Sequence, residues 1–172
     1  APFVLDQGKA LGKWKPENYG KKFYGPSTLR KGIENSRNLM TIRIAQYLGM
    51  DRITELAERT NIMSNMPPVL SMALGAGETS LIKLTSAYAS LANGGKKVES
   101  SIIDRIQDRR GKNIFVLDQA ICENCSQPYI EENPKPIIIN KSEIIFDEVN
   151  AYQMVSILKG AVDRGTGRKT KI

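Results

Sequence analysis

Apolar residues recur at three- and four-residue intervals along most of residues 1–95, with polar residues between them. This spacing puts the apolar side chains on one face of a helix, so it predicts a helical body over this part of the chain. A further periodic stretch begins at about Asp147 and predicts one more helix. The residues expected to face inward are Leu29 and Ile33, then Met40, Ile44 and Leu48, then Ile53, Leu56 and Ala57, then Leu81, Leu84, Tyr88 and Leu91, and finally Val155 and Leu158.

Residues that favour helix ends stand between these segments. A Ser, Thr or Asp side chain can accept a hydrogen bond from an amide left free at a helix start, and Gly or Asn favours the backbone turn at a helix end. The expected starts are at Ser27 or Thr28, at Asp51 and at Thr79 or Ser80, and the expected ends are at Gly49 and at Asn93-Gly94-Gly95.

Residues 96–117 have the pattern of a β-hairpin. Ile102 and Ile106 lie in one expected arm and Ile114 and Val116 in the other, with the sequence DRRG as the turn. Two other segments do not alternate in this way. Residues 65–80 are expected to form a turn and an extended apolar stretch, and residues 120–143, rich in Pro and Asn, a long surface excursion.

The pattern therefore predicts an α+β protein that is mainly helical and carries one small hairpin. It divides into a helical body at 1–95, the hairpin and the Cys-containing loop at 96–146, and a last helix with its following segment at 147–172. The N-terminal apolar run has nothing before it and lacks the features of a signal peptide, so we expect the chain to be a fragment entered in mid-strand.

Composition narrows the function classes. The 172 residues are 41% hydrophobic and 25% charged, as in a globular domain, and no apolar run approaches the roughly 20 residues that cross a bilayer. The net charge of +7 would suit an anionic partner. The sequence has no zinc-finger spacing, no RNA-binding aromatic motif and no dimerising heptad, however, so no nucleic-acid partner is expected. The absence of histidine excludes Ser-His-Asp and Cys-His catalysis, and acyl transfer would need a lysine base.

Ser36 and Asn38 stand where one expected helix ends and the next begins. Both residue types are common helix caps, so capping alone explains them. A hydroxyl and a carboxamide held at a helix junction would also suit a catalytic wall. The residues themselves leave both interpretations open.

Three blocks of the sequence resemble the transpeptidase domain of class A penicillin-binding proteins, which polymerise and cross-link peptidoglycan. They are residues 14–49, 70–95 and 150–168, in the order and spacing of that family. The family builds its acyl-transfer site from the motifs S-x-x-K, S-x-N and K-T-G. The resemblance implies that Ser36 and Asn38 form the S-x-N motif, with Ser36 passing a proton and Asn38 fixing the lysine and a substrate carbonyl. It also implies that Thr166 lines the cleft.

The sequence departs from the family pattern at the other two motifs. Residues 169–171 read Lys-Thr-Lys rather than K-T-G, and no S-x-x-K precedes Ser36. The strings Ser80 to Lys83 and Ser156 to Lys159 match S-x-x-K but follow Ser36, in the reverse of the family order. They are interpreted as a helix cap and a solvated helix turn. We therefore expect this part of a transpeptidase to be inactive alone.

The resemblance further implies the substrates and the setting. The intact family protein is a serine D,D-transpeptidase and glycosyltransferase that acts on peptidoglycan stem peptides, binds penicillin and is anchored at the periplasmic face of the inner membrane. No metal or cofactor is implied. In that oxidising setting a local disulfide is preferred for Cys122 and Cys125, with a metal half-site between molecules or free thiols as alternatives.

The alternative function is a non-catalytic helical interaction module, from a split or degenerate gene. Its basic faces would bind an anionic cell-wall polymer or a partner subunit. Association with the missing parts of the domain, or with a second copy, is expected under either interpretation.

Overall fold

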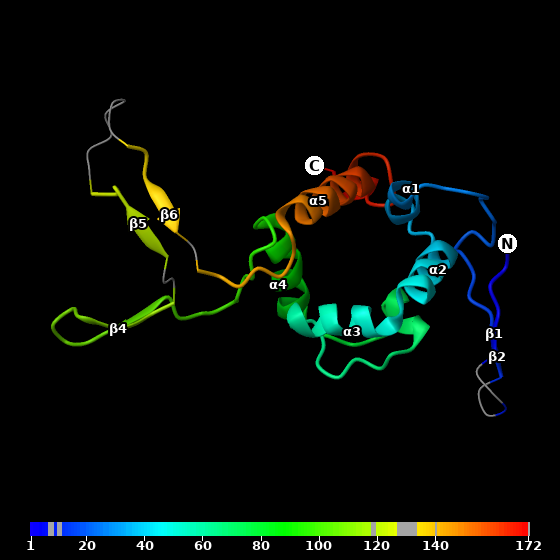
Figure 1. Cartoon of the computed structure of the whole chain (residues 1–172), viewed down its shortest axis with the longest axis horizontal. Coiled ribbons are helices and arrows are strands. Elements are labelled where there is room, and N and C mark those ends of the chain that lie inside the picture. Colours follow the sequence, from blue (N-terminus) through cyan, green and yellow to red (C-terminus); the bar gives the residue numbers. More distant parts are fainter. Residues whose placement is uncertain (7–8, 10–11, 118–119, 127–133, 140, 172) are drawn as a thin grey trace.

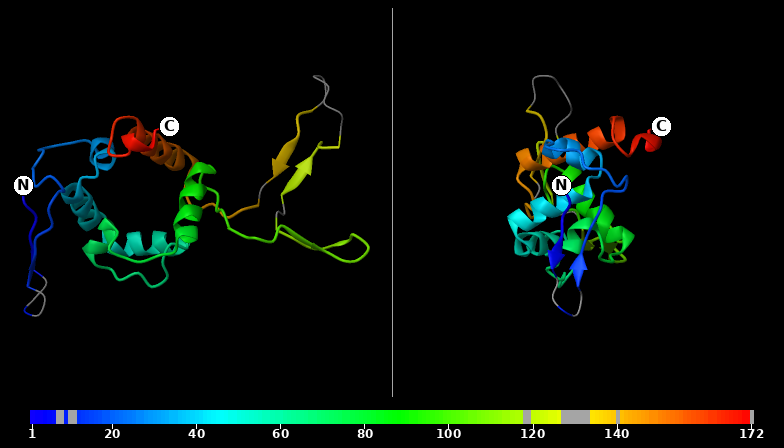
Figure 2. Two further views of the ribbon diagram at one scale, coloured as in Figure 1. Left: turned by 180° about the vertical axis from the view of Figure 1, so that it is seen from behind. Right: turned by 90° about the vertical axis from the view of Figure 1, so that its right-hand side faces the viewer.

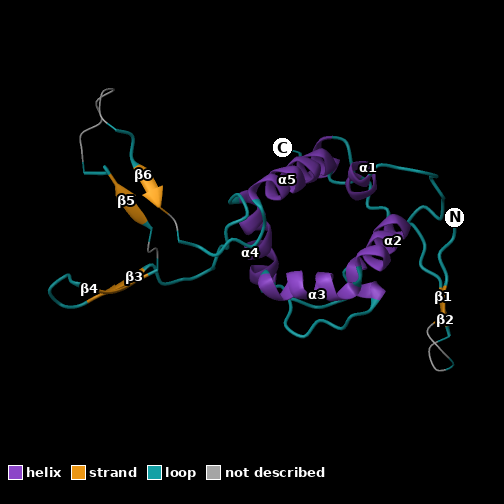
Figure 3. Ribbon diagram, viewed as in Figure 1, coloured by secondary structure: helices purple, strands orange, loops and turns teal. Residues whose placement is uncertain are grey.

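A computed structural model describes the chain apart from residues 7–8, 10–11, 118–119, 127–133, 140 and 172. The α-helices follow one another around a ring, and two β-hairpins lie on an arm that leaves the ring beside α4 (Figure 1). The fold is α+β and mainly helical, which confirms the predicted class (Figure 3). The helices are α1 (Leu29–Glu34), α2 (Asn38–Leu48), α3 (Met50–Arg59), α4 (Leu81–Ala92) and α5 (Glu148–Asp163), with 3-10 helices at η1 (Leu70–Leu74) and η2 (Arg168–Thr170).

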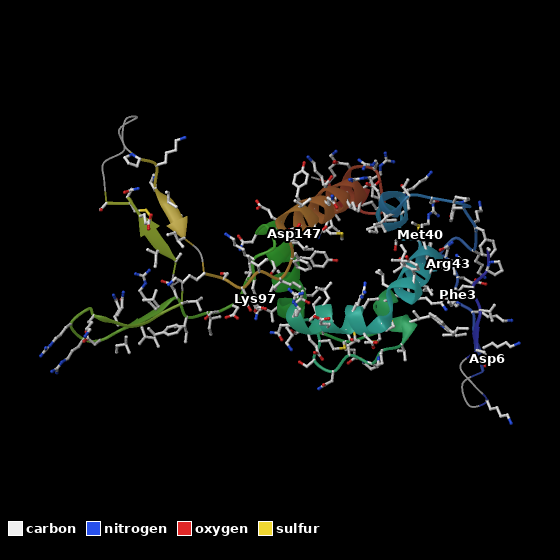
Figure 4. All side chains as sticks on the ribbon, viewed as in Figure 1. Phe3, Asp6, Met40, Arg43, Lys97 and Asp147 are labelled. Carbon is white, nitrogen blue, oxygen red and sulfur yellow. A yellow bond between two sulfur atoms is a disulfide. The ribbon has the colours of Figure 1, made fainter. Side chains whose placement is uncertain are left out.

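The ring closes where α5 packs against α1, so the end of the described chain lies beside its early part (Figure 2). α5 also packs against α4, and α2 packs against η1. The contact between α1 and α2 runs through Gly32, because a Cβ placed on this glycine would lie 3.0 Å from the Met40 Cε atom. Met40 thus covers α1 directly, next to the turn that joins the two helices (Figure 4).

The buried faces of the helices differ from the predicted ones. The buried hydrophobic residues are Leu39, Ile42, Ala45, Ala57, Ala87, Ile145, Ala151 and Ile157. Of the residues predicted to face inward, only Ala57 belongs to this set, and Leu29, Leu48, Leu56, Leu81, Leu84, Tyr88 and Val155 are exposed. In α2 the cause is plain. The helix is apolar on most of its sides, so the packing of η1 and α1 decides which side is buried.

The helix starts agree better with the sequence. Thr28 and Ser80 each accept a hydrogen bond from the backbone amide three residues on, and Asp147 accepts from the first amides of α5. The prediction for Asp51 was wrong, since α3 begins at Met50 after Gly49, and Asp51 lies in the first turn. The segment predicted to be extended contains η1, another correction, because its apolar residues fold onto α2 as a 3-10 helix.

The strands form antiparallel pairs. β1 (Leu5–Asp6) pairs with β2 (Lys13–Trp14), β3 (Arg105–Gln107) with β4 (Asn113–Val116), and β5 (Ile121–Glu123) with β6 (Ile137–Ile139). The predicted hairpin is therefore shorter than 96–117, and Ile102 lies outside it, 100% exposed. The predicted surface excursion contains a second hairpin, since three consecutive isoleucines pair with the strand that carries Cys122.

The arm is closed at its base. Lys96 bridges Ile144, the backbone amide of Lys97 donates to the carbonyl of Glu143 at 2.8 Å, and the amide of Ile145 donates to the carbonyl of Gly95 at 2.9 Å. The Lys97 Nζ atom, at the base of the arm in Figure 4, also donates to Glu143 Oε2 at 3.1 Å. The hydrogen bond and charge of Glu143 raise the pKa of Lys97 above its usual value. The chain thus leaves and re-enters the helical ring at one place.

None of the helices in the described part of the chain has the length and apolar content that a membrane crossing requires.

Candidate functional site

One surface hollow brings together Ser36, Asn38 and Thr166, the residues that the sequence analysis singled out. It has a volume of about 520 Å³. Its lining comes from the loop before α1, from the turn between α1 and α2, and from the loop after α5. The other lining residues are Asn18, Tyr19, Gly20, Tyr24, Asn35 and Arg37.

Ser36 occupies the turn between α1 and α2 in a left-handed conformation, with φ of +50°. This region costs a residue with a side chain roughly 1–2 kcal/mol, so the turn must be held by its surroundings. The backbone amides of Ser36 and Arg37 donate to the carbonyls of Ile33 and Gly32, at 3.0 and 2.9 Å. The Ser36 side chain is exposed, and its hydroxyl makes no hydrogen bond to another described residue. The hydroxyl is therefore free to meet a ligand in the hollow.

Neither Ser36 nor Asn38 caps α2. The residue at the cap position is Arg37, which makes no side-chain capping bond, and Asn38 is the first residue of the helix. The capping interpretation of the motif is therefore wrong for both side chains. The Arg37 guanidinium lies instead over the Tyr24 ring, 3.1 Å from its centroid, and forms part of the wall of the hollow.

Two asparagines fasten the loop before α1 to the start of α2. Asn38 Nδ2 donates to the carbonyl of Glu17 at 3.0 Å, and Asn18 Oδ1 accepts from the amide of Leu39 at 3.2 Å. Asn18 is buried and also donates to the carbonyl of Lys22 at 2.8 Å. The Leu39 amide is one of those with no partner inside the helix, so Asn18 caps α2 from a separate segment.

Glu34, the last residue of α1, holds the loop that brings Thr166 into the hollow. The amide of Thr166 donates to the Glu34 carbonyl at 3.1 Å. The Glu34 carboxylate accepts both from Arg164 Nε, at 2.9 Å, and from Arg164 Nη2. Arg30 adds an ion pair to the same carboxylate at 3.6 Å. These contacts join the end of α1 to the loop that follows α5.

Sequence reasoning missed Asn18, Glu34 and Arg164. Each acts through a contact with a residue far away in the chain, and such a contact leaves no periodic pattern. The one signal in the sequence was the position of Glu34 and Arg164, each two residues before a candidate site residue.

The two S-x-x-K strings lie outside the hollow. Ser80 caps α4 by accepting from the amide of Lys83 at 3.4 Å, as predicted. Ser156 lies within α5, where its hydroxyl and its carbonyl accept from the Arg30 guanidinium at 3.4 and 3.2 Å. Both serines therefore have structural partners.

Cys122 and Cys125 also lie away from the hollow, in β5 and in the turn that follows it. They are joined by a disulfide, with Cα atoms 5.8 Å apart. Among the described residues, no three His, Cys, Asp or Glu side chains gather in a group that could hold a metal ion.

Comparison with known proteins gives a consistent set of relatives. A sequence model described as the penicillin binding protein transpeptidase domain matches residues 1–171. Penicillin-binding protein 1A of Rickettsia conorii is 42% identical over 176 residues, covering 99% of this chain and 22% of that protein. The Neisseria flavescens protein of the same name is 34% identical, covering 98% of this chain and 19% of that protein. The chain thus spans about a fifth of the length of these relatives.

The solved structures agree. The crystal structure of penicillin-binding protein 1A from Haemophilus influenzae aligns with a TM-score of 0.75 at 26% identity, covering 97% of this chain and 26% of that one. The D,D-transpeptidase domain of a peptidoglycan glycosyltransferase from Eggerthella lenta aligns with a TM-score of 0.64 at 17% identity, covering 99% and 44%. The second likeness shows the fold alone.

Proposed function

The chain belongs to the penicillin-binding protein transpeptidase domain family, and we propose that Ser36 and Asn38 form one wall of its acyl-transfer site. The observation that carries this proposal is the convergence of Ser36, Asn38 and Thr166 on one hollow, from segments that are far apart in the sequence. The attacking serine and its lysine base come from an S-x-x-K motif outside residues 1–172. The residues of the strand that faces this wall come from a K-T-G motif, which also lies outside residues 1–172.

Ser36 acts in proton transfer. The nucleophilic serine attacks the carbonyl carbon of a D-Ala-D-Ala peptide bond, its oxygen bonds to that carbon, and the carbon–nitrogen bond breaks. The proton of the nucleophile reaches the leaving amine of D-alanine through the lysine and the Ser36 hydroxyl, which can accept one proton while it donates another. The nitrogen of an amine on a neighbouring strand then bonds to the ester carbon, the bond from that carbon to the serine oxygen breaks, and a proton from the amine returns to the serine oxygen. The exposed hydroxyl of Ser36, which bonds to none of the residues that the structure describes, and its fixed backbone support this role.

Asn38 orients the reacting groups. Its amide nitrogen carries two donors, one of which is used by the carbonyl of Glu17. The second donor and the carbonyl oxygen remain for the lysine and for a substrate peptide group. The bond to Glu17 fixes the carboxamide plane before a substrate arrives, so less ordering is needed in the transition state.

The substrates of the proposed reaction are peptidoglycan stem peptides, and β-lactams acylate the same site. The complete protein also carries a glycosyltransferase and a membrane anchor and works at the periplasmic face of the inner membrane. Residues 1–172 alone have no acyl-transfer activity, because they hold one of the three motifs. The family membership and the coverage of about a fifth of the relatives support these proposals.

A graft tests the proposal. Residues 1–171 replace the aligned segment of Rickettsia conorii penicillin-binding protein 1A, and acylation by a fluorescent penicillin is followed by gel. We expect the graft to be labelled, Ser36→Ala to lower the acylation rate about 10²–10⁴-fold, and the 172-residue chain alone to stay unlabelled. Ser80→Ala and Ser156→Ala in the graft serve as controls and keep the original rate. Normal labelling of Ser36→Ala, or labelling of the chain alone, contradicts the proposal.

A non-catalytic interaction module is the second candidate, favoured by the exposed isoleucines of the arm. Ile114 and Ile138 are both largely exposed, and the arm contributes no residue to the described hollow. Stop codons on both sides of the coding segment, together with co-sedimentation of the chain with cell-wall polymer, would favour this candidate over the transpeptidase.

A further inference from the structure

Glu34 and Arg164 stand two residues before Ser36 and Thr166, which both line the hollow. We propose that the Glu34–Arg164 pair fixes the position of Ser36 relative to Thr166 for acyl transfer. This inference rests on the proposed function, since it names the residues that set the geometry of the same site. Neither side chain touches the substrate. Both are positioning residues.

The pair is built as a two-point contact. The two oxygens of the Glu34 carboxylate accept from two nitrogens of one guanidinium, the geometry that fixes both the distance and the plane of the partners. The Glu34 carbonyl accepts from the Thr166 amide in addition. One residue at the end of α1 therefore holds the loop after α5 through its side chain and through its backbone.

Burial sets this carboxylate apart from an ordinary surface ion pair. Glu34 is 4% exposed, whereas the Arg164 side chain is 54% exposed. A desolvated carboxylate must keep its partners, because an uncompensated buried charge is costly. Arg164 therefore cannot leave Glu34 freely, and the loop that carries Thr166 stays with it.

Two glycines make room for the pair. A Cβ on Gly160 would overlap Glu34 Oε1 and lie 2.7 Å from Arg164 Nη2. A Cβ on Gly165 would overlap the Glu34 carbonyl oxygen and lie 2.9 Å from Ala161 Cα. α5 and its loop thus approach α1 so closely that only residues without side chains fit. The consequence is a fixed spacing between the Ser36 turn and the Thr166 loop.

Such spacing matters for rate more than for binding. A displacement of about 1 Å between catalytic groups can cost roughly 10²-fold in rate while a substrate still binds. Loss of the pair should therefore lower the first-order acylation step and leave the affinity for penicillin nearly unchanged. A residue that only stabilised the fold would not produce this split.

The first arm of the test needs no activity. Hydrogen exchange of the Thr166 amide is measured in the 172-residue chain, with Glu34→Gln, Arg164→Lys and the control Arg168→Gln. Glu34→Gln removes the charge at nearly constant size, and Arg164→Lys keeps the charge but not the two-point geometry. We expect both to speed the exchange about 10-fold or more, while Arg168→Gln, which removes a nearby charge unpaired with Glu34, leaves it unchanged.

The second arm measures acylation in the Rickettsia conorii graft. Glu34→Gln and Arg164→Lys should lower the first-order acylation constant about 10–100-fold with less than about 3-fold change in the penicillin dissociation constant. The double variant should lose no more than the worse single one, because each change breaks the same contact. Circular dichroism checks that each variant is folded. Arg164→Lys, altered at an exposed side chain, keeps the test available if Glu34→Gln unfolds.

Each outcome decides between the two claims. If the Ser36→Ala graft acylates normally, or the unaltered graft is not labelled, the proposed function fails and this inference falls with it. If Ser36→Ala fails to acylate but both pair variants acylate at the original rate, the inference alone is overturned. The inference alone is also overturned if the losses in acylation rate of the two single variants multiply in the double variant, or if the Thr166 amide exchanges at its original rate in the pair variants.

Discussion

Asn18 Oδ1 accepts a hydrogen bond from the backbone amide of Leu39 at 3.2 Å, and thereby caps the helix that begins beside Ser36. The cap comes from a residue that lies before α1 in the sequence. This contact, together with the bond from Asn38 to Glu17, therefore joins the start of α2 to the loop before α1, and both segments line the hollow.

Replacement of Asn18 should measure this contact. Asn18→Ala removes the acceptor and is expected to lower the free energy of unfolding by about 1–2 kcal/mol. Asn18→Asp keeps the acceptor and places a negative charge at a helix N-terminus, but it loses the donor to the Lys22 carbonyl, so it should restore only part of this loss. Urea denaturation followed by circular dichroism measures both variants. Equal stability of Asn18→Ala and the unaltered chain would show that the cap carries no energy.

Gly95 and Gly94 provide a matched pair at the base of the arm. Both have positive φ, +90° and +66°, but only at Gly95 would a Cβ meet other atoms. It would overlap the carbonyl oxygen of Phe146 and lie 2.9 Å from the carbonyl carbon. Gly94→Ala should therefore cost about 1 kcal/mol for the backbone conformation alone, and Gly95→Ala about 3 kcal/mol or more. Thermal unfolding compares the two, and equal losses would contradict the steric account.

The arm should be removable. Replacement of residues 99–142 by a short Gly-Ser linker leaves the bridge between Lys96 and Ile144 and the contacts of Gly95 in place. Of the residues described in the deleted segment, none belongs to the buried hydrophobic set. The shortened chain should unfold cooperatively within about 4 °C of the original midpoint. Ile145→Ala, which truncates a buried side chain next to the same junction, should cost about 2–4 kcal/mol and serves as the contrast.

The loop after α5 offers a test by pH. The hydrogen bond from Lys171 Nζ to Asp163 Oδ1, at 3.1 Å, and the charge of Lys171 hold the pKa of Asp163 below its ordinary value of 3.8. The contact therefore contributes fully above pH 3.8 and is lost as the pH falls through the lower pKa of the folded state. Lys171→Gln should raise the pKa of Asp163, as followed by carboxyl chemical shifts. Lys159→Gln should raise it less, because its charge is a smaller cause, and the reverse order would contradict this assignment.

The helices were predictable from sequence and their buried faces were not. Caps such as Thr28 and Ser80 act on amides a few residues away, so a local pattern is enough to find them. The buried side of α2 depends instead on which elements pack against it. The second hairpin was missed because its short isoleucine strand stands among Pro and Asn residues, shows no alternation of apolar and polar positions, and gains its structure by pairing with β5.

Only the residues of the candidate site that belong to a sequence motif could be predicted. Ser36, Asn38 and Thr166 could be marked from the resemblance, and all three line one hollow, while their roles stay a prediction. The groups that hold them could not be marked. Glu34 meets Arg164 across 130 residues, and one acidic residue facing one basic residue is a common pairing that no sequence pattern distinguishes.

The separation of Glu34 and Arg164 along the chain sets an order in time. Because Arg164 follows Glu34 by 130 positions, a ribosome working at roughly 5–20 residues per second releases the loop after α5 on the order of ten seconds after the Ser36 turn. During synthesis the Ser36 turn therefore emerges before the Glu34 carboxylate has its Arg164 partner. A nascent polypeptide at this stage carries the early lining residues of the hollow but not Thr166, and a truncated product that stops short of the late loop never acquires the contact that holds Thr166 in place.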